Sequence, residues 1–508
     1  MKFATVWPRS ELLPLILLIA AAATHCVLLL VYVHFGPVYL DAGFYLSASD
    51  LVYHGKLPYL DFFYVQMPVY PYIYGIPALL FGTGIFVARW TSLAFALAAF
   101  VLTVRSAWRV GGLNAGCICA ILLGMNGFHA YCMSVTKLYA LSAFWSAASL
   151  YFLTRSPRLL PSCAAAICLT LGVSTRLTLL PALAVLLLFL IWRDRWRAWP
   201  SVTAAGVTGL IIMVPFLILA PEQAYFNLFG IHTSADAGPH VHGLIGKAGV
   251  VSALIRDHFL AFILLIFTVC TVASRVKLNG GHRGEIVAIG GMALSVTAAH
   301  FTANWFDASY QSIVFPLFAW LIAYSTATVL SSVIVPNWRS VLLLTIFLAG
   351  LATPVAYGGR SLVRSEGLNV LQQLSRIGDF INSQTDPEAS LITCNAFFTY
   401  SASRKPLAGF EGAPFTYTPA WPVEQCSKYH TVNDELMVAA VRAQSAGAII
   451  IYHDSFAVGF PGFYPVTEAR QRALFDEIEQ NYALAGTFPN VLGGEDPLLI
   501  YLPKRRGK

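Results

Sequence analysis

The stretch that decides the fold is residues 38–76, VYLDAGFYLSASDLVYHGKLPYLDFFYVQMPVYPYIYGI. It follows one long apolar run and precedes another, but its Pro, Tyr and Asp content makes it too polar to cross a bilayer. It carries three separated carboxylates, Asp41, Asp50 and Asp61, in an amphipathic setting. Long loops of about forty residues between membrane spans are usually functional. We therefore predict that this loop forms the floor of an active site at the membrane surface.

The composition around the loop is that of a membrane protein. Hydrophobic residues make up 57% of the 508 and charged residues 11%, whereas charged residues make up about 25% of soluble domains. The net charge of +7 does not indicate nucleic-acid binding, because the Lys and Arg residues form short clusters between apolar runs, as membrane topology requires. The nine cysteines show no C-x-x-C spacing. Only Cys394 and Cys426 lie in the polar C-terminal part, where the sequence allows a disulfide without implying one.

Apolar runs long enough to span a bilayer, about 17–25 residues each, recur as far as residue 357. The first, Leu12–Val33, is too long for a cleavable signal sequence and is expected to remain as a span. Hydropathy predicts about eleven spans, near 12–34, 84–104, 113–131, 138–154, 159–173, 177–192, 201–220, 258–274, 285–303, 310–335 and 340–357.

The distribution of basic residues provides an independent check on these spans. If the N-terminus is cytoplasmic, the inner loops should hold the basic clusters. They do, at Arg105, Arg109, Arg155, Arg158, Arg193, Arg195, Arg197, Arg275, Lys277, Arg283 and Arg339. The number of spans is then odd. The first outer loop, residues 35–83, and everything after residue 357 then lie together on the non-cytoplasmic side.

The C-terminal part is predicted to be a soluble extracytoplasmic domain, residues 358–508, after a transmembrane module of residues 1–357. Three short apolar runs are predicted strands, Ser390–Cys394, Ala448–Tyr452 and Leu498–Leu502. They alternate with segments of helical periodicity, Leu362–Ile381, Val432–Ala446 and Thr467–Ala483. Such alternation over about 150 residues indicates one small α/β domain. The predicted fold class is therefore mainly α: a polytopic transmembrane helical bundle with a C-terminal extracytoplasmic α/β domain.

A family resemblance extends over most of residues 12–357 and is most specific in the first outer loop. It lies in the segments DAGFYLSASDLVYHGKLPYLDFF, QMPVYPYIYGIPALLFG and ARWTSLAFALAAF, and more diffusely in TRLTLLPALAVLLL, PEQAYFNLFGIHT and FDASYQSIVFPLFAWLIA. These segments resemble the polytopic GT-C glycosyltransferases, especially the bacterial group that includes protein O-mannosyltransferases and lipid A aminoarabinose transferases.

The resemblance implies transfer of a sugar from a polyprenyl-phosphate donor to a glycan, lipid or protein acceptor on the non-cytoplasmic face. A bacterial inner membrane is the location that it implies. The family places an acid at the position of Asp41, as catalytic base or member of a metal site. Many relatives have a second acid directly after it, where this chain has Ala42. Asp41 is therefore expected to act alone or with Asp61, and the metal ligands stay unknown, with a divalent cation as an open alternative.

The two loop carboxylates each have a plainer alternative. Glycosyl transfer needs a carboxylate to take the acceptor proton, which is the role expected of Asp41. Asp is also favoured as the N-cap of a helix, here one over Ala42–Tyr53. Asp61 is expected to join a metal site or position the acceptor, or else to be a surface loop carboxylate.

The departing phosphate needs cationic partners. Arg176, in a very short outer turn, is the first candidate, Lys137 the second and Arg89 the third. The alternative for all three is a side chain that reaches the membrane interface as an anchor. The remaining predicted substrate-binding residues are His232, Tyr310 and Gln311, which are expected to line the donor site.

Two further alternatives remain open. The tyrosines Tyr64, Tyr70, Tyr72 and Tyr74 are explained by an interfacial aromatic belt or by stacking on sugar. The whole chain has a rival interpretation as a polytopic transporter or lipid flippase, against which stand the long first loop, the large outer domain and the lack of repeated halves. An inactive GT-C-like scaffold is the third interpretation, because of Ala42.

Overall fold

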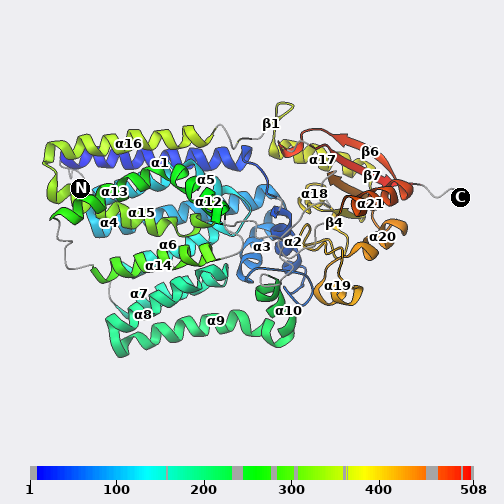
Figure 1. Ribbon diagram of the computed structural model, residues 1–508, viewed down its shortest axis with the longest axis horizontal. Coiled ribbons are helices and arrows are strands. Elements are labelled where there is room, and N and C mark those ends of the chain that lie inside the picture. Colours follow the sequence, from blue (N-terminus) through cyan, green and yellow to red (C-terminus); the bar gives the residue numbers. More distant parts are fainter. Residues whose placement is uncertain are drawn as a thin grey trace, which may run out of the picture.

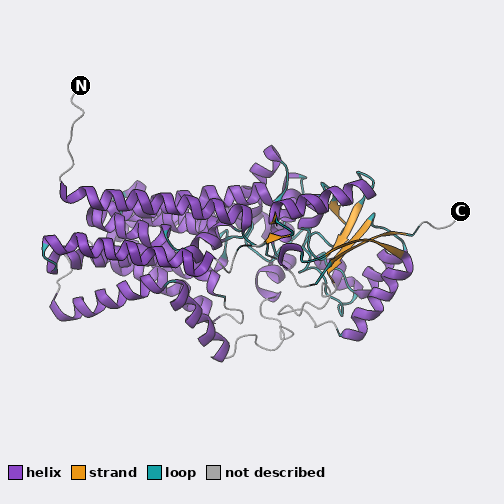
Figure 2. Ribbon diagram, turned by 90° about the horizontal axis from the view of Figure 1, so that it is seen from above, coloured by secondary structure: helices purple, strands orange, loops and turns teal. Residues whose placement is uncertain are grey.

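The computed structural model describes residues 9–39, 41–155, 158–231, 244–275, 283–302, 307–358, 362, 364–452, 467–493 and 496–504. These residues form a long helical bundle and a small α/β domain at one end of it, with two short helices, α2 and α3, in between (Figure 1). Seen from above, the strands of the larger sheet lie at the same end of the molecule (Figure 2). The predicted fold class, a polytopic helical bundle with a C-terminal α/β domain, is confirmed.

The bundle consists of helices most of which overlap the predicted apolar runs, whereas α12 lies between the predicted runs 201–220 and 258–274. Their bounds are α1 Arg9–Phe35, α4 Ile85–Gly124, α5 Gly127–Ser134, α6 Tyr139–Leu153, α7 Leu159–Val173, α8 Leu180–Asp194, α9 Trp199–Leu219, α12 Leu244–Asp257, α13 Phe259–Arg275, α14 Arg283–Thr302, α15 Phe315–Val333 and α16 Pro336–Gly358. Within α4, Gly112 has φ 76° and breaks the helix between two predicted spans. Glycine adopts this left-handed conformation at no steric cost.

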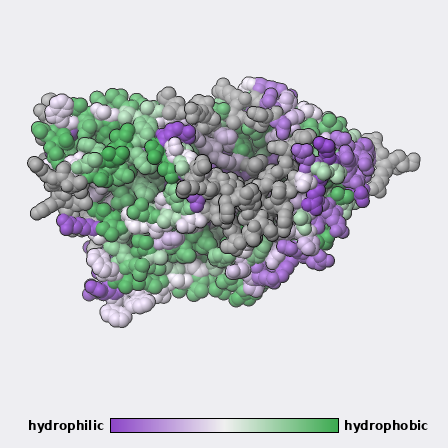
Figure 3. Space-filling model, viewed as in Figure 1, coloured by the Kyte–Doolittle hydropathy of each residue, from purple (hydrophilic) through white to green (hydrophobic). Residues whose placement is uncertain are grey.

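The protein is an integral membrane protein. Among the described residues, five helical stretches are long and apolar enough to cross a membrane, or six if the pair Gly246–Asp257 and Phe259–Thr271, bent by 86°, is one span. Two of the five, Ile85–Gly124 and Leu177–Leu219, each overlap two predicted runs. The visible surface of the bundle is largely hydrophobic, whereas that of the α/β domain is largely hydrophilic (Figure 3). The total of about eleven spans stays a prediction.

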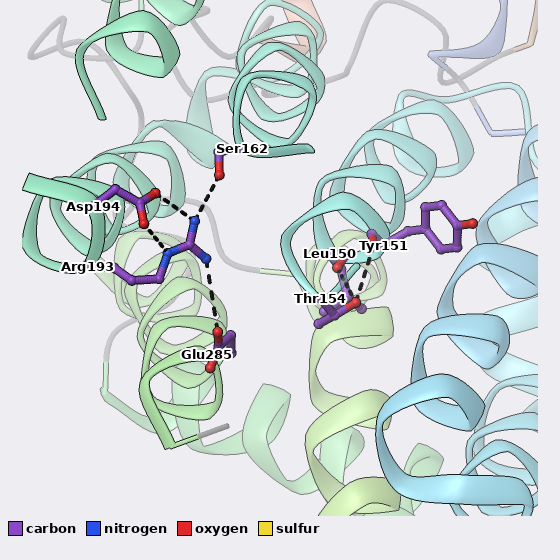
Figure 4. A network of polar contacts seen from close by, with 7 residues as sticks. All are labelled: Leu150, Tyr151, Thr154, Ser162, Arg193, Asp194 and Glu285. Carbon is purple, nitrogen blue, oxygen red and sulfur yellow. Dashed lines mark hydrogen bonds and ion pairs between the residues drawn. The ribbon is translucent and has the colours of Figure 1, made fainter. Parts of the chain in front are cut away.

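A polar network ties three helices together at the end of the bundle far from the α/β domain (Figure 4). Nε and Nη2 of Arg193, in the last turn of α8, each lie 2.7 Å from a carboxylate oxygen of Asp194. Nη2 also donates to Ser162 Oγ of α7 at 2.8 Å, and Nη1 lies 4.0 Å from Glu285 of α14. The helix ends that carry three of the basic clusters therefore meet, as the topology prediction requires. Which side of a membrane they face stays a prediction.

The α/β domain contains a five-stranded mixed sheet. The strands are β3 Ser390–Thr393, β4 Lys405–Pro406, β5 Ala448–Tyr452, β6 Tyr482–Phe488 and β7 Leu498–Pro503, in the order β4-β3-β5-β7-β6. β3 is parallel to β4 and β5, and β7 is antiparallel to β5 and β6. A two-stranded hairpin, β1 Arg364–Ser365 and β2 Leu368–Asn369, precedes the sheet. The three predicted strands are confirmed, whereas β4 and β6 were not predicted.

Helices cover both faces of this sheet. They are α17 Val370–Gln384, α18 Phe397–Ser401, α19 Val423–Tyr429, α20 Asp434–Arg442 and α21 Glu468–Asn481. Because successive strand residues point to opposite faces, Ile449 and Ile451 of β5 pack in a core with α20 and α21, while Ile450 packs in a second core with α17 and α18. Asn369 and Gln372 form a capping box that starts α17.

The first outer loop shares this second core. It folds into α2 Ala42–Tyr53 and α3 Val69–Phe81. Phe44 of α2 stacks on Tyr64 at 5.2 Å and meets Phe415 of the α/β domain edge-on at 5.1 Å. A Cβ on Gly43 would lie 2.7 Å from the backbone nitrogens of Ala396 and Phe397, so a glycine lets α2 approach α18 this closely. The loop is therefore a packed layer between bundle and sheet, and the predicted domains of residues 1–357 and 358–508 meet in one hydrophobic core.

The structure corrects the interfacial-belt prediction for three tyrosines of the first outer loop and shows whether Cys394 and Cys426 form a disulfide. Tyr64 and Tyr70 are fully buried and Tyr74 is 3% exposed, and the rings of Tyr70 and Tyr74 stack on each other at 4.0 Å. An interfacial aromatic belt is therefore wrong for these three residues, because their rings face protein. Cys394 and Cys426 are both buried and neither is in a disulfide, so the disulfide that the sequence allowed is not formed.

Candidate active site

Asp41 pairs with a lysine from another loop. Its Oδ2 lies 3.1 Å from Lys137 Nζ, with 20% of the Asp41 side chain and 13% of the Lys137 side chain exposed. The helix Ala42–Tyr53 begins directly after Asp41, as predicted, but the Asp41 carboxylate makes no capping hydrogen bond to it. The N-cap alternative is therefore wrong for the side chain, because the carboxylate faces the ammonium group instead. Lys137 Nζ also lies 3.7 Å from the ring centroid of Tyr39, a favourable cation–π contact.

Arg176 lies on the same side of the bundle as this pair, in the turn between α7 and the 3-10 helix Leu177–Leu179. Its guanidinium lies 4.3 Å from the ring centroid of Tyr310 and 5.5 Å from that of Tyr139. Lys137 Nζ is 5.6 Å from the same Tyr139 ring. The Tyr139 ring therefore contacts both cations. The charges of Asp41 and Arg176 both shift the pKa of the neighbouring Tyr45 phenol.

The pKa of Tyr45 reflects its burial and the opposite charges of Asp41 and Arg176. Burial raises the pKa of its phenol well above the ordinary value, the Asp41 charge raises it further, and the Arg176 charge lowers it. Burial also raises the pKa of Tyr39. Both phenols therefore remain neutral over the physiological pH range and act as hydrogen-bonding groups beside a charged acid and two charged bases.

A hydroxyl chain orients Tyr139. Asp307 accepts hydrogen bonds from the backbone nitrogen of Ser309, at 2.7 Å, and from its hydroxyl. Because the Ser309 hydroxyl donates to this carboxylate, the Tyr139 hydroxyl, 2.7 Å from Ser309 Oγ, must donate to Ser309.

The structure also shows where the remaining predicted site residues lie. Arg89 is 1% exposed and donates to the carbonyls of Val33, Gly36 and Pro37 at 2.6–2.9 Å. Those carbonyls end α1, so these contacts give Arg89 a structural role rather than the phosphate contact expected of it. Asp61 is exposed and accepts from the backbone nitrogen of Leu57 at 2.7 Å, which is the surface-loop alternative.

Three of the expected donor-site residues have different outcomes. Tyr310 is in the site as expected, because its ring lies against the Arg176 guanidinium. Gln311 is buried, and its side chain contacts His300 and Thr297 of α14. Gln311 therefore supports the position of His300 instead of lining the donor site. His232 lies outside the described residues.

The sequence analysis missed Tyr39, Tyr45, Tyr139, Thr178 and Ser309. A local signal existed for two of them, because Tyr39 lies two residues before Asp41 and Tyr139 two residues after Lys137. Aromatic residues next to charged candidates are plausible cation–π partners. Thr178 and Ser309 also lie two residues after charged partners, Arg176 and Asp307. Their contacts with His300 and Tyr139 come from other elements, so those contacts leave no local pattern in the sequence.

Comparison with solved structures shows that the fold is that of the GT-C membrane glycosyltransferases. The chain is similar to ArnT from Cupriavidus metallidurans bound to undecaprenyl phosphate, with a TM-score of 0.63 and 11% identity over 97% of this chain and 98% of that one. Apo ArnT gives 0.62 and 12%, over 96% and 97%. The Archaeoglobus fulgidus oligosaccharyltransferase in complex with Zn and sulfate gives 0.53 and 13%, over 93% and 72%. At these identities the likeness shows the fold.

No protein-family model matches this sequence, and no curated protein matches it.

Proposed function

We propose that the protein is a glycosyltransferase that moves a sugar from a polyprenyl-phosphate carrier to an acceptor hydroxyl on the non-cytoplasmic face of the membrane. One observation carries the proposal: the loop carboxylate Asp41 pairs with Lys137, and Lys137 and Arg176 both lie against the ring of Tyr139. The fold supports it, because ArnT, which shares that fold, has been seen with undecaprenyl phosphate bound. Sugar transfer from such a lipid needs a base and a phosphate-binding cation side by side.

The chemistry follows from the charges. The Asp41 carboxylate takes the proton of the acceptor hydroxyl as its oxygen attacks the anomeric carbon. The bond between that carbon and the phosphate oxygen breaks, and the electron pair leaves with the lipid phosphate. Arg176 and Lys137 stabilise the growing negative charge on the phosphate, where preorganised donors contribute most. A single displacement of this kind inverts the anomeric configuration.

A divalent cation does not fit the described part of the site. Asp41 Oδ2 faces the Lys137 ammonium at 3.1 Å, and a lysine donates hydrogen bonds but offers no acceptor to a metal. Within the described residues, no group of three or more His, Cys, Asp or Glu side chains is arranged to hold a metal. No step of the proposed reaction therefore passes through a metal ion.

The proposal is tested with purified protein and a panel of radiolabelled polyprenyl-phosphate sugars. Wild type is expected to transfer label from at least one donor, and Asp41→Asn is expected to lower the rate about 10²–10⁴-fold, the usual contribution of a general base. Asp50→Asn, on the same helix but bonded to Thr83, is the matched control and should retain the wild-type rate. Transfer that survives Asp41→Asn unchanged would dismiss the base, and movement of the lipid across vesicles without transfer would support the transporter.

A further inference from the structure

A polar chain runs from Arg176 into the bundle. Arg176 Nε donates to Thr178 Oγ1 at 3.3 Å. His300 Nε2 lies 3.1 Å from the same oxygen. The other ring nitrogen of His300 lies 3.2 Å from the side-chain amide nitrogen of Gln311. The chain ends at Thr297, whose hydroxyl is 2.9 Å from Gln311 Oε1.

The inner members of this chain are hidden from solvent. His300 is 1% exposed and Gln311 is 6% exposed, and they come from α14 and from the 3-10 helix Ala308–Ile313 that precedes α15. Polar groups in such a place are costly unless they are paired, and in membrane bundles they usually mark function. Here both ring nitrogens of His300 are paired, so the imidazole orientation is fixed.

Donor accounting shows what the chain does to Arg176. A guanidinium only donates, so Thr178 Oγ1 must accept from Nε. The Gln311 amide nitrogen also only donates, so Nδ1 of His300 accepts from it and Nε2 carries the ring hydrogen. Nε2 therefore donates to Thr178 Oγ1, and this second donor holds that oxygen in place. The His300 ring also lies 5.5 Å from the Tyr310 ring, which in turn supports the guanidinium face. His300 therefore supports both neighbours of Arg176.

Within the described residues, the edge of the Arg176 guanidinium formed by its two Nη atoms is left to bind a ligand. Its face lies on Tyr310 and its Nε is engaged, and neither Nη atom donates to a group within the described residues. Two parallel Nη donors on a fixed plane match two phosphate oxygens in bidentate fashion, which a freely rotating side chain matches less often.

We propose that Thr178, His300 and Gln311 are positioning residues that hold the Nη edge of Arg176 toward a lipid phosphate. The inference rests on the proposed function, because it names how that function's phosphate is gripped. It adds a distinct requirement: the three residues act only through the Nε of Arg176 and through the ring beneath it. Removing them should therefore matter only while residue 176 is an arginine.

The experiment measures phosphate recognition in the full-length protein in detergent. Dissociation constants are determined for undecaprenyl phosphate and for undecaprenol, and their ratio isolates the phosphate from the tail. The variants are His300→Ala, Arg176→Lys and the two combined. Lysine keeps the positive charge but has no Nε for Thr178 to hold.

We expect His300→Ala to reduce the affinity ratio about tenfold in the arginine background, the upper end of the value of one neutral hydrogen bond. In the Arg176→Lys background the same change should reduce it less than about twofold, because coupled residues are non-additive. His300→Gln, which offers a polar atom near the position of Nε2, should restore the ratio to within about threefold of wild type.

The control is His25→Ala. His25 is another buried histidine of the bundle, 1% exposed and stacked on Phe100 at 4.8 Å, and its removal should leave the affinity ratio unchanged. Equal losses from His300→Ala in both backgrounds, or a loss in His25→Ala as large as in His300→Ala, would overturn the positioning role. A wild-type protein that binds undecaprenyl phosphate no better than undecaprenol would instead overturn the proposed function, so the two failures are distinguishable.

Discussion

At the scale of single residues, the Asp41 carboxylate has two alternative partners: the first turn of the helix that follows it, and Lys137. Its sequence position favours a helix N-cap, and the helix does start at Ala42. The carboxylate nevertheless faces Lys137, because an ammonium group at 3.1 Å offers a charge-assisted partner that outweighs one capping bond. A residue that gives up its local partner for a distant one is typical of a functional site.

The pair makes Lys137 the next residue to test. Lys137→Gln removes the cation beside both Asp41 and the expected phosphate, so we expect kcat/KM for the polyprenyl-phosphate sugar to fall about 10–100-fold. Lys137→Arg keeps the charge and should retain more activity than the glutamine variant. Steady-state kinetics on the two variants decide the matter, and a glutamine variant as active as wild type would remove Lys137 from the site.

At the scale of elements, the position of the first loop depends on how α1 ends. Arg89 of α4 satisfies carbonyls that the last turn of α1 leaves without helical partners. Arg89→Met should therefore lower the free energy of unfolding by about 2–4 kcal/mol, because buried carbonyls lose a charged donor. Thermal unfolding in detergent measures this. Arg105→Met, an exposed arginine of the same helix, is the control, and an equal effect of the two changes would contradict the capping role.

The approach of α2 to α18 gives a second prediction at this scale. Gly→Ala inside a helix ordinarily stabilises by about 0.5–1 kcal/mol. Gly43→Ala should instead destabilise by about 1–3 kcal/mol, since the added Cβ would lie 2.7 Å from backbone nitrogens of Ala396 and Phe397. Gly206→Ala on α9, where a Cβ meets nothing within 4 Å, should be neutral or stabilising. Both are measured by the unfolding midpoint, and a stabilised Gly43→Ala protein would show that the two helices are not in close contact.

At the scale of the whole molecule, the outer loop and the α/β domain form one cooperative layer. Phe44 joins them, being 2% exposed between Tyr64 and Phe415. Phe44→Ala should cost about 3–5 kcal/mol and speed amide hydrogen exchange both in α2 and in α18. Phe100→Ala, in the separate core of the bundle, should leave exchange in α18 unchanged. If exchange rises in α2 alone after Phe44→Ala, the loop and the domain are independent units.

The sequence predicted the parts of this molecule that depend on local patterns. Hydropathy predicted α7 and α9 almost to the residue, and the apolar run Ala448–Tyr452 is β5. Edge strands such as β4, two residues long, leave no pattern to detect. Asp41 was predicted from the family resemblance, and Arg176 and Lys137 were predicted from their positions at outer helix ends. The true partners of Arg89 and Gln311 could not be predicted, because they depend on which helices lie side by side.

The proposed mechanism requires a lipid phosphate to bind between Arg176 and Lys137, with the sugar presented to Asp41. The most direct measurement is a cryo-EM structure of the Asp41→Asn protein with a polyprenyl-phosphate sugar. We predict a phosphate oxygen about 3 Å from a guanidinium Nη of Arg176, with the anomeric carbon facing residue 41. A phosphate bound elsewhere, with no contact to Arg176 or Lys137, would contradict the account.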